Sequence, residues 1–276
     1  MQSLLQVARS GRPAGVPIPT PGPFRPLEAA EIRFRRGQVV MIAAQPNGGK
    51  TLASLAFAVA ANVPTLYVSA DTDDRTMLTR SAAIVSQQTV AEIEELLDHG
   101  GREMVEDDID TLSNLRFSFD PSPSMEDIDL EVQAFEEAFG EPPHLLVVDN
   151  LLNVSGGGDE WGGLRSTMSD LHSLARASEA CIIVLHHISE SNNRDPRFPA
   201  SRFHLMGKIA ALPEMILTVG MDSQEGLFRI AAVKNRSGPH DPTGETYTTL
   251  YVDAARMTIH PNVAELAAAR KRSEWT

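Results

Sequence analysis

The chain contains one segment whose residue types suit the binding of a phosphate group. Residues 44–51 read AQPNGGKT and directly follow the apolar run 39–43. Gly48 and Gly49 lack a Cβ atom, so the backbone there can curl with its N–H groups pointing toward an anion. A helix expected over about residues 50–61 would add the positive end of its dipole. The segment therefore predicts a nucleotide site, although a glycine-rich turn before a helix could produce the same spacing.

The pattern GxxxxGK[ST] assigns separate roles to the residues of this loop. Lys50 would reach the β- and γ-phosphates of ATP, and Thr51 would ligate Mg2+. Ala44 stands where the pattern has its first glycine, and alanine is the smallest other residue. The predicted nucleotide-binding residues of the loop are Ala44, Gln45, Pro46, Asn47, Gly48, Gly49, Lys50 and Thr51.

Two acidic positions follow apolar runs that would end beside this loop. One run ends in Asp149, a carboxylate that could bind Mg2+ together with Thr51. After the strand expected over residues 65–70, Asp71 is the first candidate and Asp73 the second for the group that orients and polarises an attacking water. Strand-terminal acids can instead cap turns or helix starts, which is the alternative for all of them.

Two pairs of polar residues lie at the ends of other predicted strands. His186 and His187 could contact a γ-phosphate; a histidine pair also suits a metal, but no further His or Cys lies at suitable spacing nearby. Lys234 and Arg236 are two residues apart, so they share one face, and a guanidinium can neutralise charge on a phosphoryl group. A neighbouring subunit could be their target, and ordinary surface charge is the alternative.

Strand and helix patterns alternate along most of the chain. This order predicts an α/β fold with a mostly parallel central sheet flanked by helices, extended by antiparallel strands near the C-terminus. The predicted strands are residues 39–43, 65–70, 115–119, 144–149, 181–186, 215–219, 228–234 and 246–252.

The ends of the chain differ from its middle. Six prolines between Gly11 and Pro26 predict an extended arm or linker over residues 1–30 instead of packed structure. One folded domain is expected over residues 31–262, followed by a polar tail over 263–276.

Composition limits the partners and the compartment. The formal net charge of −13 argues against binding nucleic acid over the whole surface, so any such contact must be local. Acidic residues gather in 92–110 and 126–137, which predict the solvated faces of two helices. Cys181 is the single cysteine and is expected to be a buried strand residue. Without a membrane-length apolar run or a signal peptide, a cytoplasmic protein that binds no membrane is expected.

Together these motifs resemble the RecA-like ATPase core of hexameric helicases of the DnaB type and of the short plasmid RepA-type helicases. The resemblance covers most of residues 37–260. DnaB-type loops have the form ARPSMGKT, which matches Ala44, Pro46 and residues 49–51. The run VLHHIS at 184–189 is similar to the plasmid helicases, and the Lys-x-Arg-x-Gly-Pro element of the DnaB type matches residues 234–239.

The resemblance implies a RecA-like P-loop NTPase fold and a catalytic set that includes Lys50. Asp71 would replace the family's glutamate with a side chain one methylene shorter, so slow turnover is expected. Arg80 would contact the adenine, and His187 would occupy the sensor position. Lys234 and Arg236 would reach the ATP of the adjacent subunit.

Members of this family thread single-stranded DNA through a ring. By resemblance, two loops would contact the DNA: residues 155–163, with one aromatic that could stack on a base, and residues 189–203. Six copies of the second loop could line a positive channel, and mobile solvent loops are the alternative. The predicted DNA-binding residues are Arg194, Arg197, Arg202 and Trp161.

These predictions lead to two functions. The first is an ATP- and Mg2+-dependent motor on single-stranded DNA, a hexameric ring with ATP sites between subunits that acts in replication or recombination. The second is a nucleotide-switched assembly or loading protein with little translocation, which Asp71 and the acidic charge favour. A small-molecule kinase fits less well, because Lys234, Arg236 and the two long loops suit a ring better than a lid.

Overall fold

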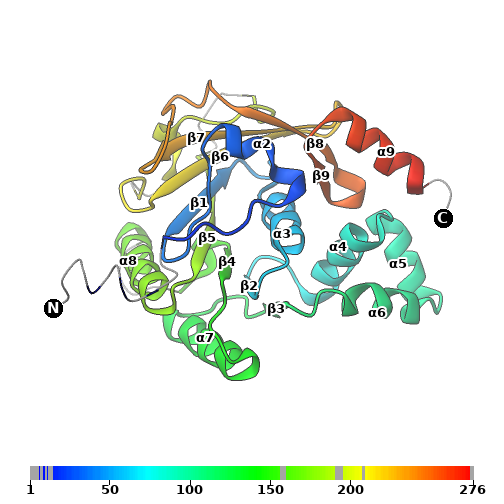
Figure 1. The fold of residues 1–276 in the computed structure, drawn as a ribbon, viewed down its shortest axis with the longest axis horizontal. Coiled ribbons are helices and arrows are strands. Elements are labelled where there is room, and N and C mark those ends of the chain that lie inside the picture. The colour runs from blue at the N-terminus through cyan, green and yellow to red at the C-terminus, as the bar shows by residue number, and fades with distance from the viewer. Residues whose placement is uncertain are drawn as a thin grey trace.

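In the computed structural model, the described residues are 6, 9, 11, 15–155, 160–189, 195–206 and 209–273. Within this part of the chain, nine strands form one sheet in the order β3-β2-β4-β5-β1-β6-β7-β8-β9 (Figure 1). The strands are β1 (Val39–Ala44), β2 (Thr65–Ser69), β3 (Leu115–Ser118), β4 (Leu145–Asp149), β5 (Cys181–His187), β6 (Met215–Asp222), β7 (Leu227–Asn235), β8 (Thr248–Asp253) and β9 (Thr258–His260). The α-helices are α2 (Pro26–Ala29), α3 (Lys50–Ala61), α4 (Asp74–Ser86), α5 (Val90–Asp98), α6 (Arg102–Asp110), α7 (Met125–Phe139), α8 (Glu160–Ser178) and α9 (Val263–Ser273). The short 3-10 helices are η1 (Gly22–Phe24), η2 (Leu151–Asn153), η3 (Arg202–His204) and η5 (Ala254–Arg256).

The sheet is parallel from β3 to β6 and antiparallel beyond. Strand β1 pairs in parallel with β5 on one side and β6 on the other. Strands β7, β8 and β9 are added in antiparallel pairs. The predicted α/β class and the mostly parallel sheet with antiparallel C-terminal strands are therefore confirmed. The three residues of β9 were not predicted, because so short a segment carries no readable alternation.

Helices cover both faces of the central strands, which explains why those strands are apolar throughout. Every residue of β1 and β4 is buried. In β1, Val40 and Ile42 pack with α3, whereas Val39 and Met41 pack with α7 and α8 on the other face. Successive strand side chains point to opposite faces, so a continuous apolar run serves both layers.

The proline-containing segment before β1 is packed against the domain, contrary to the prediction of an extended linker. Ile18, Phe24 and Leu27 are buried, and the Phe24 ring lies 5.2 Å from that of Phe57 on α3. The prolines restrain the backbone, but the apolar residues between them still find a surface to cover. In this structure the packed chain begins before residue 31.

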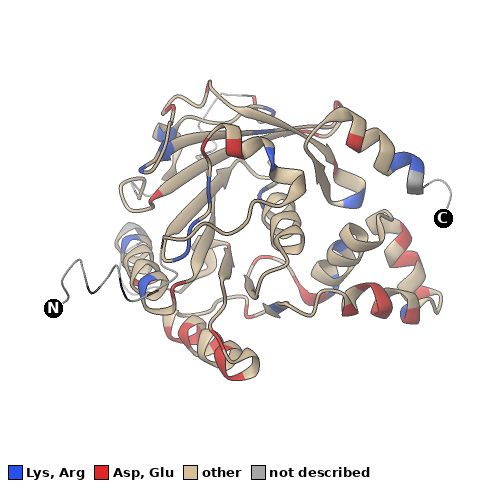
Figure 2. Ribbon diagram, in the orientation of Figure 1, with Lys and Arg blue, Asp and Glu red and all other residues tan. Residues whose placement is uncertain are grey.

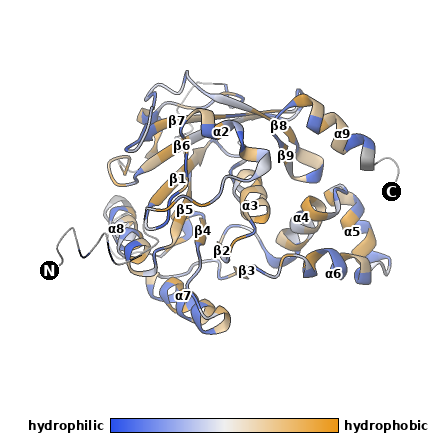
Figure 3. Cartoon of the chain, viewed as in Figure 1, coloured by the Kyte–Doolittle hydropathy of each residue, from blue (hydrophilic) through white to orange (hydrophobic). Residues whose placement is uncertain are grey.

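The acidic stretches form exposed helix faces, as predicted, but the first stretch contains two helices. Gly100, at a φ of 89°, ends α5 and allows α6 to start at Arg102. Figure 2 shows many Asp and Glu residues along α5, α6 and α7, which lie at the periphery of the molecule, and Figure 3 shows hydrophobic residues along α4 and α5. A small apolar cluster holds the three helices α4–α6 together, formed by Ala82, Ala83, Ile93 and Val105.

Two other sequence expectations concern burial and membranes. Cys181 is fully buried in β5, and burial raises the pKa of its thiol to about 12. Among the helices of the described residues, none has both the length and the apolar character needed to cross a membrane.

Candidate nucleotide site

The loop after β1 has the geometry of a phosphate cradle. A Cβ atom placed on Gly48 would lie 2.7 Å from Ala44 Cβ, and Gly49 has a φ of 85° that side-chain-bearing residues rarely adopt. The methyl group of Ala44 therefore fills the space behind the loop. Glycine is required at positions 48 and 49. The Gly48 N–H donates to the carbonyl oxygen of Gln45 at 3.0 Å, which closes the turn before α3 begins at Lys50.

A cavity of about 440 Å³ opens in front of this loop. It lies at the carboxyl ends of β1, β2 and β4, where ligands bind in open α/β sheets. Ala44 and Gln45, which were predicted from the sequence to contact the nucleotide, are not among the residues that line the cavity. The lining residues are Pro46, Asn47, Gly48, Gly49, Lys50, Thr51, Leu52, Asp71, Thr72, Arg80, Asp149, His187, Met221, Ala254 and Met257.

Asp149 and Thr51 meet at the floor of the cavity. The Thr51 hydroxyl donates to Asp149 Oδ2 at 2.8 Å. Burial raises the pKa of Asp149, while the hydrogen bonds from Thr51 and Tyr67 oppose that rise. A hydroxyl and a carboxylate are oxygen ligands of the kind that Mg2+ prefers, so these two side chains fit that ion.

Tyr67 of β2 supports this pair from inside the sheet, and the sequence analysis did not identify it. Its hydroxyl donates to Asp149 Oδ2 at 3.0 Å and lies 2.9 Å from Ser54 Oγ. Burial raises the pKa of Tyr67 well above its usual value, so the phenol stays protonated and remains a donor. A tyrosine hydroxyl in the middle of a buried strand was the available signal.

Lys50 and His187 lie next to each other in the wall of the cavity. Lys50 Nζ lies 3.5 Å from His187 Nδ1, and Asn150 Nδ2 lies 3.4 Å from His187 Nε2. Asn150 Oδ1 accepts from the Leu152 N–H, which turns its amide nitrogen toward the ring. Burial lowers the pKa of His187 and so favours the neutral imidazole, which can accept at one nitrogen only. One of the two contacts is therefore not a hydrogen bond, and the ring is loosely held.

His186 has a different environment from its neighbour. It is fully buried, and its Nε2 lies 3.1 Å from the carbonyl oxygen of Met206. Burial lowers the pKa of His186 to about 4. Adjacent residues of a strand point to opposite faces, so only His187 lines the cavity.

The two candidate acids after β2 are also separated by the structure. Asp71 lines the cavity. Asp73 is the N-cap of α4, where its carboxylate accepts from the Thr76 N–H at 2.9 Å and from the Thr76 hydroxyl at 2.7 Å. These hydrogen bonds lower the pKa of Asp73. The helix-cap alternative therefore describes Asp73, and Asp71 is the acid that could act on a bound nucleotide.

One wall of the cavity comes from C-terminal elements that the sequence did not connect with the site. Met221 of β6 together with Ala254 and Met257 around η5 add apolar surface, and Arg80 of α4 adds a cation. No motif marks the three apolar residues, because Met221 reaches the loop through the pairing of β6 with β1, and Ala254 and Met257 through the antiparallel strands beyond it.

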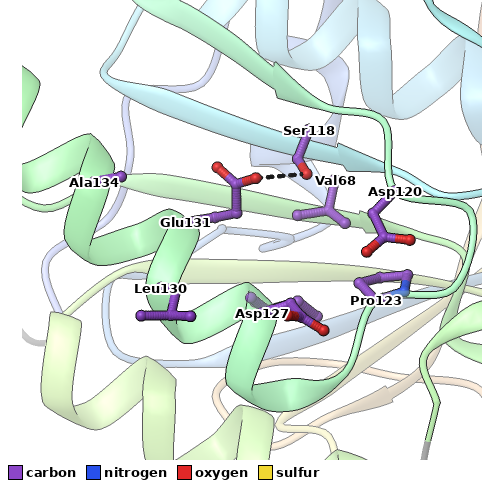
Figure 4. A pocket seen from close by; sticks show the side chains of 9 residues that line it. Val68, Ser118, Asp120, Pro123, Asp127, Leu130, Glu131 and Ala134 are labelled. Carbon is purple, nitrogen blue, oxygen red and sulfur yellow. Dashed lines mark hydrogen bonds between the residues drawn. The ribbon is translucent and has the colours of Figure 1, made fainter.

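A second hollow, of about 380 Å³, lies between β3 and α7 (Figure 4). Its acids have structural partners: Glu131 accepts from the Ser118 hydroxyl at 2.9 Å, and Asp127 forms a capping box with Ser124. Among the described residues that line it there is no lysine or arginine. This hollow is therefore unsuited to phosphate.

Comparison with known proteins agrees with this geometry. Residues 20–248 match the family model described as the DnaB-like helicase C terminal domain. The chain belongs to this family. The Gene 65 proteins of Mycobacterium phages L5 and D29 are also similar, at 35% and 36% identity; the aligned regions cover 88% and 80% of this chain and 92% and 98% of theirs.

Two solved structures share the fold of this DnaB-like domain. One, described as an ATPase domain, matches with a TM-score of 0.78 at 16% identity, covering 94% of this chain and 96% of that one. The other is a DnaB-like replicative helicase studied with primase, which matches with a TM-score of 0.77 at 17% identity, covering 94% of this chain and 67% of that one. The predicted family and the RecA-like ATPase fold are therefore confirmed.

In this DnaB-like domain, Lys234 and Arg236 lie away from the cavity of their own chain. Lys234 pairs with Ile216 near the start of β6, whereas Phe228, at the other end of β7, pairs with Met221 beside the cavity. Lys234 lies six residues after Phe228 along the strand, a distance of about 20 Å. The two cations are therefore at the opposite edge of the sheet from the phosphate loop.

The predicted DNA contacts of the DnaB-like domain are only partly described. Arg194 and the side chain of Trp161 lie outside the described part of the structure, and α8 starts at Glu160, inside the predicted first loop. Arg197 is 2.6 Å from Asp195 and 3.6 Å from Asp222, so acids offset its charge. Arg202 lies over the ring of Phe203, and the Phe203 side chain is 76% exposed.

Proposed function

We propose that this chain is an ATP-hydrolysing ring motor that acts on single-stranded DNA, as a helicase or translocase in DNA replication or recombination. Membership of the DnaB-like family supports an NTPase of the helicase class. The observation that carries the proposal further is the separation of Lys234 and Arg236 from the cavity of their own chain. Cations at that edge can serve a phosphate only if it is bound by another subunit, which a closed ring of copies, with six as the expected number, would supply.

The chemical roles follow from positions in the cavity. The N–H groups of the loop and Lys50 bind the phosphates, and Arg80 contacts the adenine. Thr51 and Asp149 would hold Mg2+, which when bound neutralises charge on the β- and γ-phosphates. Asp71 orients a water for attack on the γ-phosphorus and accepts its proton. The bond from that phosphorus to the β–γ bridging oxygen then breaks, leaving ADP and phosphate.

His187 suits the task of sensing the γ-phosphate. Its ring lies between two donors, Lys50 and Asn150, and cannot accept from both. A phosphate oxygen beside Lys50 offers the ring N–H an acceptor. When that oxygen leaves after hydrolysis, the His187 ring returns to its place between Lys50 and Asn150. Strand β5, which carries His187, leads directly into the second predicted DNA loop, with Arg194, Arg197 and Arg202.

The experiment that tests the proposal measures ATP hydrolysis with and without single-stranded DNA. It compares the natural chain, Arg236→Ala, Lys50→Ala and mixtures of the two variants. We expect DNA to stimulate the natural chain, each variant alone to lose turnover, and mixtures to regain part of it, because a Lys50→Ala subunit still offers Arg236 to its neighbour. Arg102→Ala, an exposed cation on α6, is the matched control and should retain full turnover.

The second candidate is a nucleotide-switched assembly protein. Two observations favour it: Asp71 is shorter than the family's glutamate, and Asp195 and Asp222 offset the charge of Arg197. In that case ATP would change the oligomeric state, turnover would not respond to DNA, and mixing the variants would restore nothing. Such a result would remove the motor.

A further inference from the structure

Glu214 connects three elements at the edge of the sheet opposite the phosphate loop. Its Oε2 accepts from the Val39 N–H, at the start of β1, at 3.0 Å. Its Oε1 lies 3.5 Å from His172 Nδ1 on α8 and 3.9 Å from Arg236 Nη1 after β7. The Glu214 side chain is 15% exposed, so this carboxylate occupies a defined place.

The backbone binds the same elements together around Glu214. Its N–H donates to the Val39 carbonyl at 3.0 Å, and its own carbonyl accepts from the Arg236 N–H at 3.1 Å. The base of the Arg236 side chain is therefore set by hydrogen bonds. The Arg236 guanidinium is free to change position, because the side chain is long and 55% exposed.

Backbone carbonyls are the other contacts of this pair of cations. Arg236 Nη2 donates to Ala211 at 3.1 Å, and Lys234 Nζ donates to Ala210 at 3.0 Å and to Ala211 at 2.7 Å. Burial and the charge of Arg236 lower the pKa of Lys234 to about 8. The Ala211 carbonyl therefore holds the Arg236 guanidinium by a hydrogen bond, whereas the Glu214 carboxylate, at 3.9 Å, attracts it by charge.

We propose that Glu214 is a positioning residue that orients the Arg236 guanidinium toward the ATP of the adjacent subunit, an inference that rests on the proposed role of Arg236 between subunits. The Glu214 carboxylate is held by Val39 and flanked by His172, so it places a fixed negative charge beside the mobile Arg236 guanidinium. A guanidinium already turned toward its target loses less conformational freedom when the phosphate arrives.

The helix that carries His172 gives this arrangement a second consequence. Helix α8 starts inside the first predicted DNA loop, and His172 Nε2 is buried without a hydrogen-bond partner in the described structure. A shift of α8 would move His172 relative to Glu214. It would therefore change the position of the carboxylate that orients Arg236. His172 is twelve residues, or about 18 Å of helix, from Glu160, so α8 connects the first predicted DNA loop with Glu214 at the other edge of the sheet.

A purely structural role for Glu214, joining β6 to β1, predicts different results. Glutamine keeps the side-chain oxygen that accepts from the Val39 N–H and removes the charge that orients Arg236. For Glu214→Gln we expect kcat for DNA-stimulated ATP hydrolysis to fall by about tenfold, with KM for ATP within about twofold. The melting temperature should stay within about 2 °C, because glutamine keeps the bond to Val39 and the Arg236 side chain of the lost ion pair is 55% exposed.

The matched control is Glu31→Gln. Glu31 lines the same small polar pocket as Glu214 but contacts Asn235 through its backbone carbonyl, so kcat should not change. Glu214→Asp keeps the charge on a shorter side chain and should recover part of the lost kcat. Mixing Glu214→Gln with Lys50→Ala subunits should restore turnover, as expected for Arg236→Ala.

The deciding measurement is the double variant Glu214→Gln with Arg236→Ala. If Glu214 acts through Arg236, the double variant has the kcat of Arg236→Ala alone; an equal further loss in both backgrounds would show a structural role and overturn the inference. If Glu214→Gln keeps full kcat while Arg236→Ala loses it, the positioning role fails and the proposed function stands. If Arg236→Ala itself keeps full kcat, both fail.

Discussion

Asp71 is the residue whose chemistry most directly determines turnover in the proposed site. It lines the nucleotide cavity, whereas Asp73, two residues later, is occupied as the cap of α4. Asp71→Asn should lower kcat for ATP hydrolysis by about a hundredfold, because an amide cannot accept the proton of the attacking water. Steady-state hydrolysis checks kcat, and titration with a fluorescent ATP analogue should show a Kd within about threefold.

Two further variants test that assignment. Asp73→Asn is the matched control and should retain kcat, since asparagine also caps helices. Asp71→Glu restores the side-chain length found in the family and should raise kcat. A large loss in Asp73→Asn with none in Asp71→Asn would exchange the roles of the two acids.

His186 makes stability depend on pH. Its folded pKa is about 4, below the unfolded value of about 6.5, so the unfolded chain binds more protons between these values. The contribution of neutral His186 to the free energy of unfolding is complete above pH 6.5 and is lost as the pH falls toward 4. The free energy of unfolding from urea titration should therefore be lower at pH 5 than at pH 7, with about 2 kcal/mol of the difference due to His186.

His186→Gln keeps a donor for the Met206 carbonyl and removes the titration. Its free energy of unfolding should change by about 2 kcal/mol less between pH 7 and pH 5 than that of the natural chain. An equal change in both proteins would show that His186 accepts protons while folded.

At the scale of elements, the phosphate loop depends on strand β7, which is distant in sequence. A Cβ atom on Gly49 would lie 2.8 Å from Phe228 Cε2 and 3.2 Å from Met221 Sδ. Gly49→Ala should therefore displace the loop and weaken ATP binding by at least about tenfold, in addition to the cost of about 1 kcal/mol for a positive φ. Titration with a fluorescent ATP analogue measures the first effect and thermal unfolding the second.

Gly140→Ala is the matched control for that change. Gly140 ends α7 with a φ of 76°, and an added Cβ would meet nothing within 4 Å. It should lose similar stability and keep the natural affinity for ATP. If both variants bind ATP equally well, the contact with Phe228 does not shape the loop.

At the scale of the whole molecule, the segment before β1 belongs to the core. Phe24 is 2% exposed and packs on Phe57, and Phe57 also lies 4.4 Å from Phe34 between ring centres. Phe24→Ala should lower the free energy of unfolding by about 3 to 5 kcal/mol, as expected for a large buried ring. Val16→Ala, at a position 52% exposed, should change it by less than about 0.5 kcal/mol. Urea denaturation of both variants measures these changes. Equally small changes in the free energy of unfolding would show that residues 15–30 are a linker and not part of the core.

The sequence by itself was sufficient for the fold class and for the strand, turn and helix that form the predicted phosphate loop. A buried strand, a glycine turn and a helix are local patterns, so residues 39–61 could be interpreted without knowing the rest of the fold. For Asp71, Asp149 and His187 the sequence predicted the edge of the sheet, because each lies at or shortly after the end of a parallel strand; it left the choice against Asp73 and His186 to the structure.

Only the tertiary structure could show which neighbours complete the site. Tyr67, Met221 and Met257 carry no motif. Met221 and Met257 line the cavity because β6 and the turn after β8 lie beside the loop, and Tyr67 supports Asp149 from inside the sheet. The choice between Asp71 and Asp73, and between His186 and His187, depended on which face of an element each side chain occupies. Short-range patterns determine which elements form, whereas burial and hydrogen-bond partners depend on long-range packing, and the packing of Phe24 and the contacts of Glu214 are decided at that level.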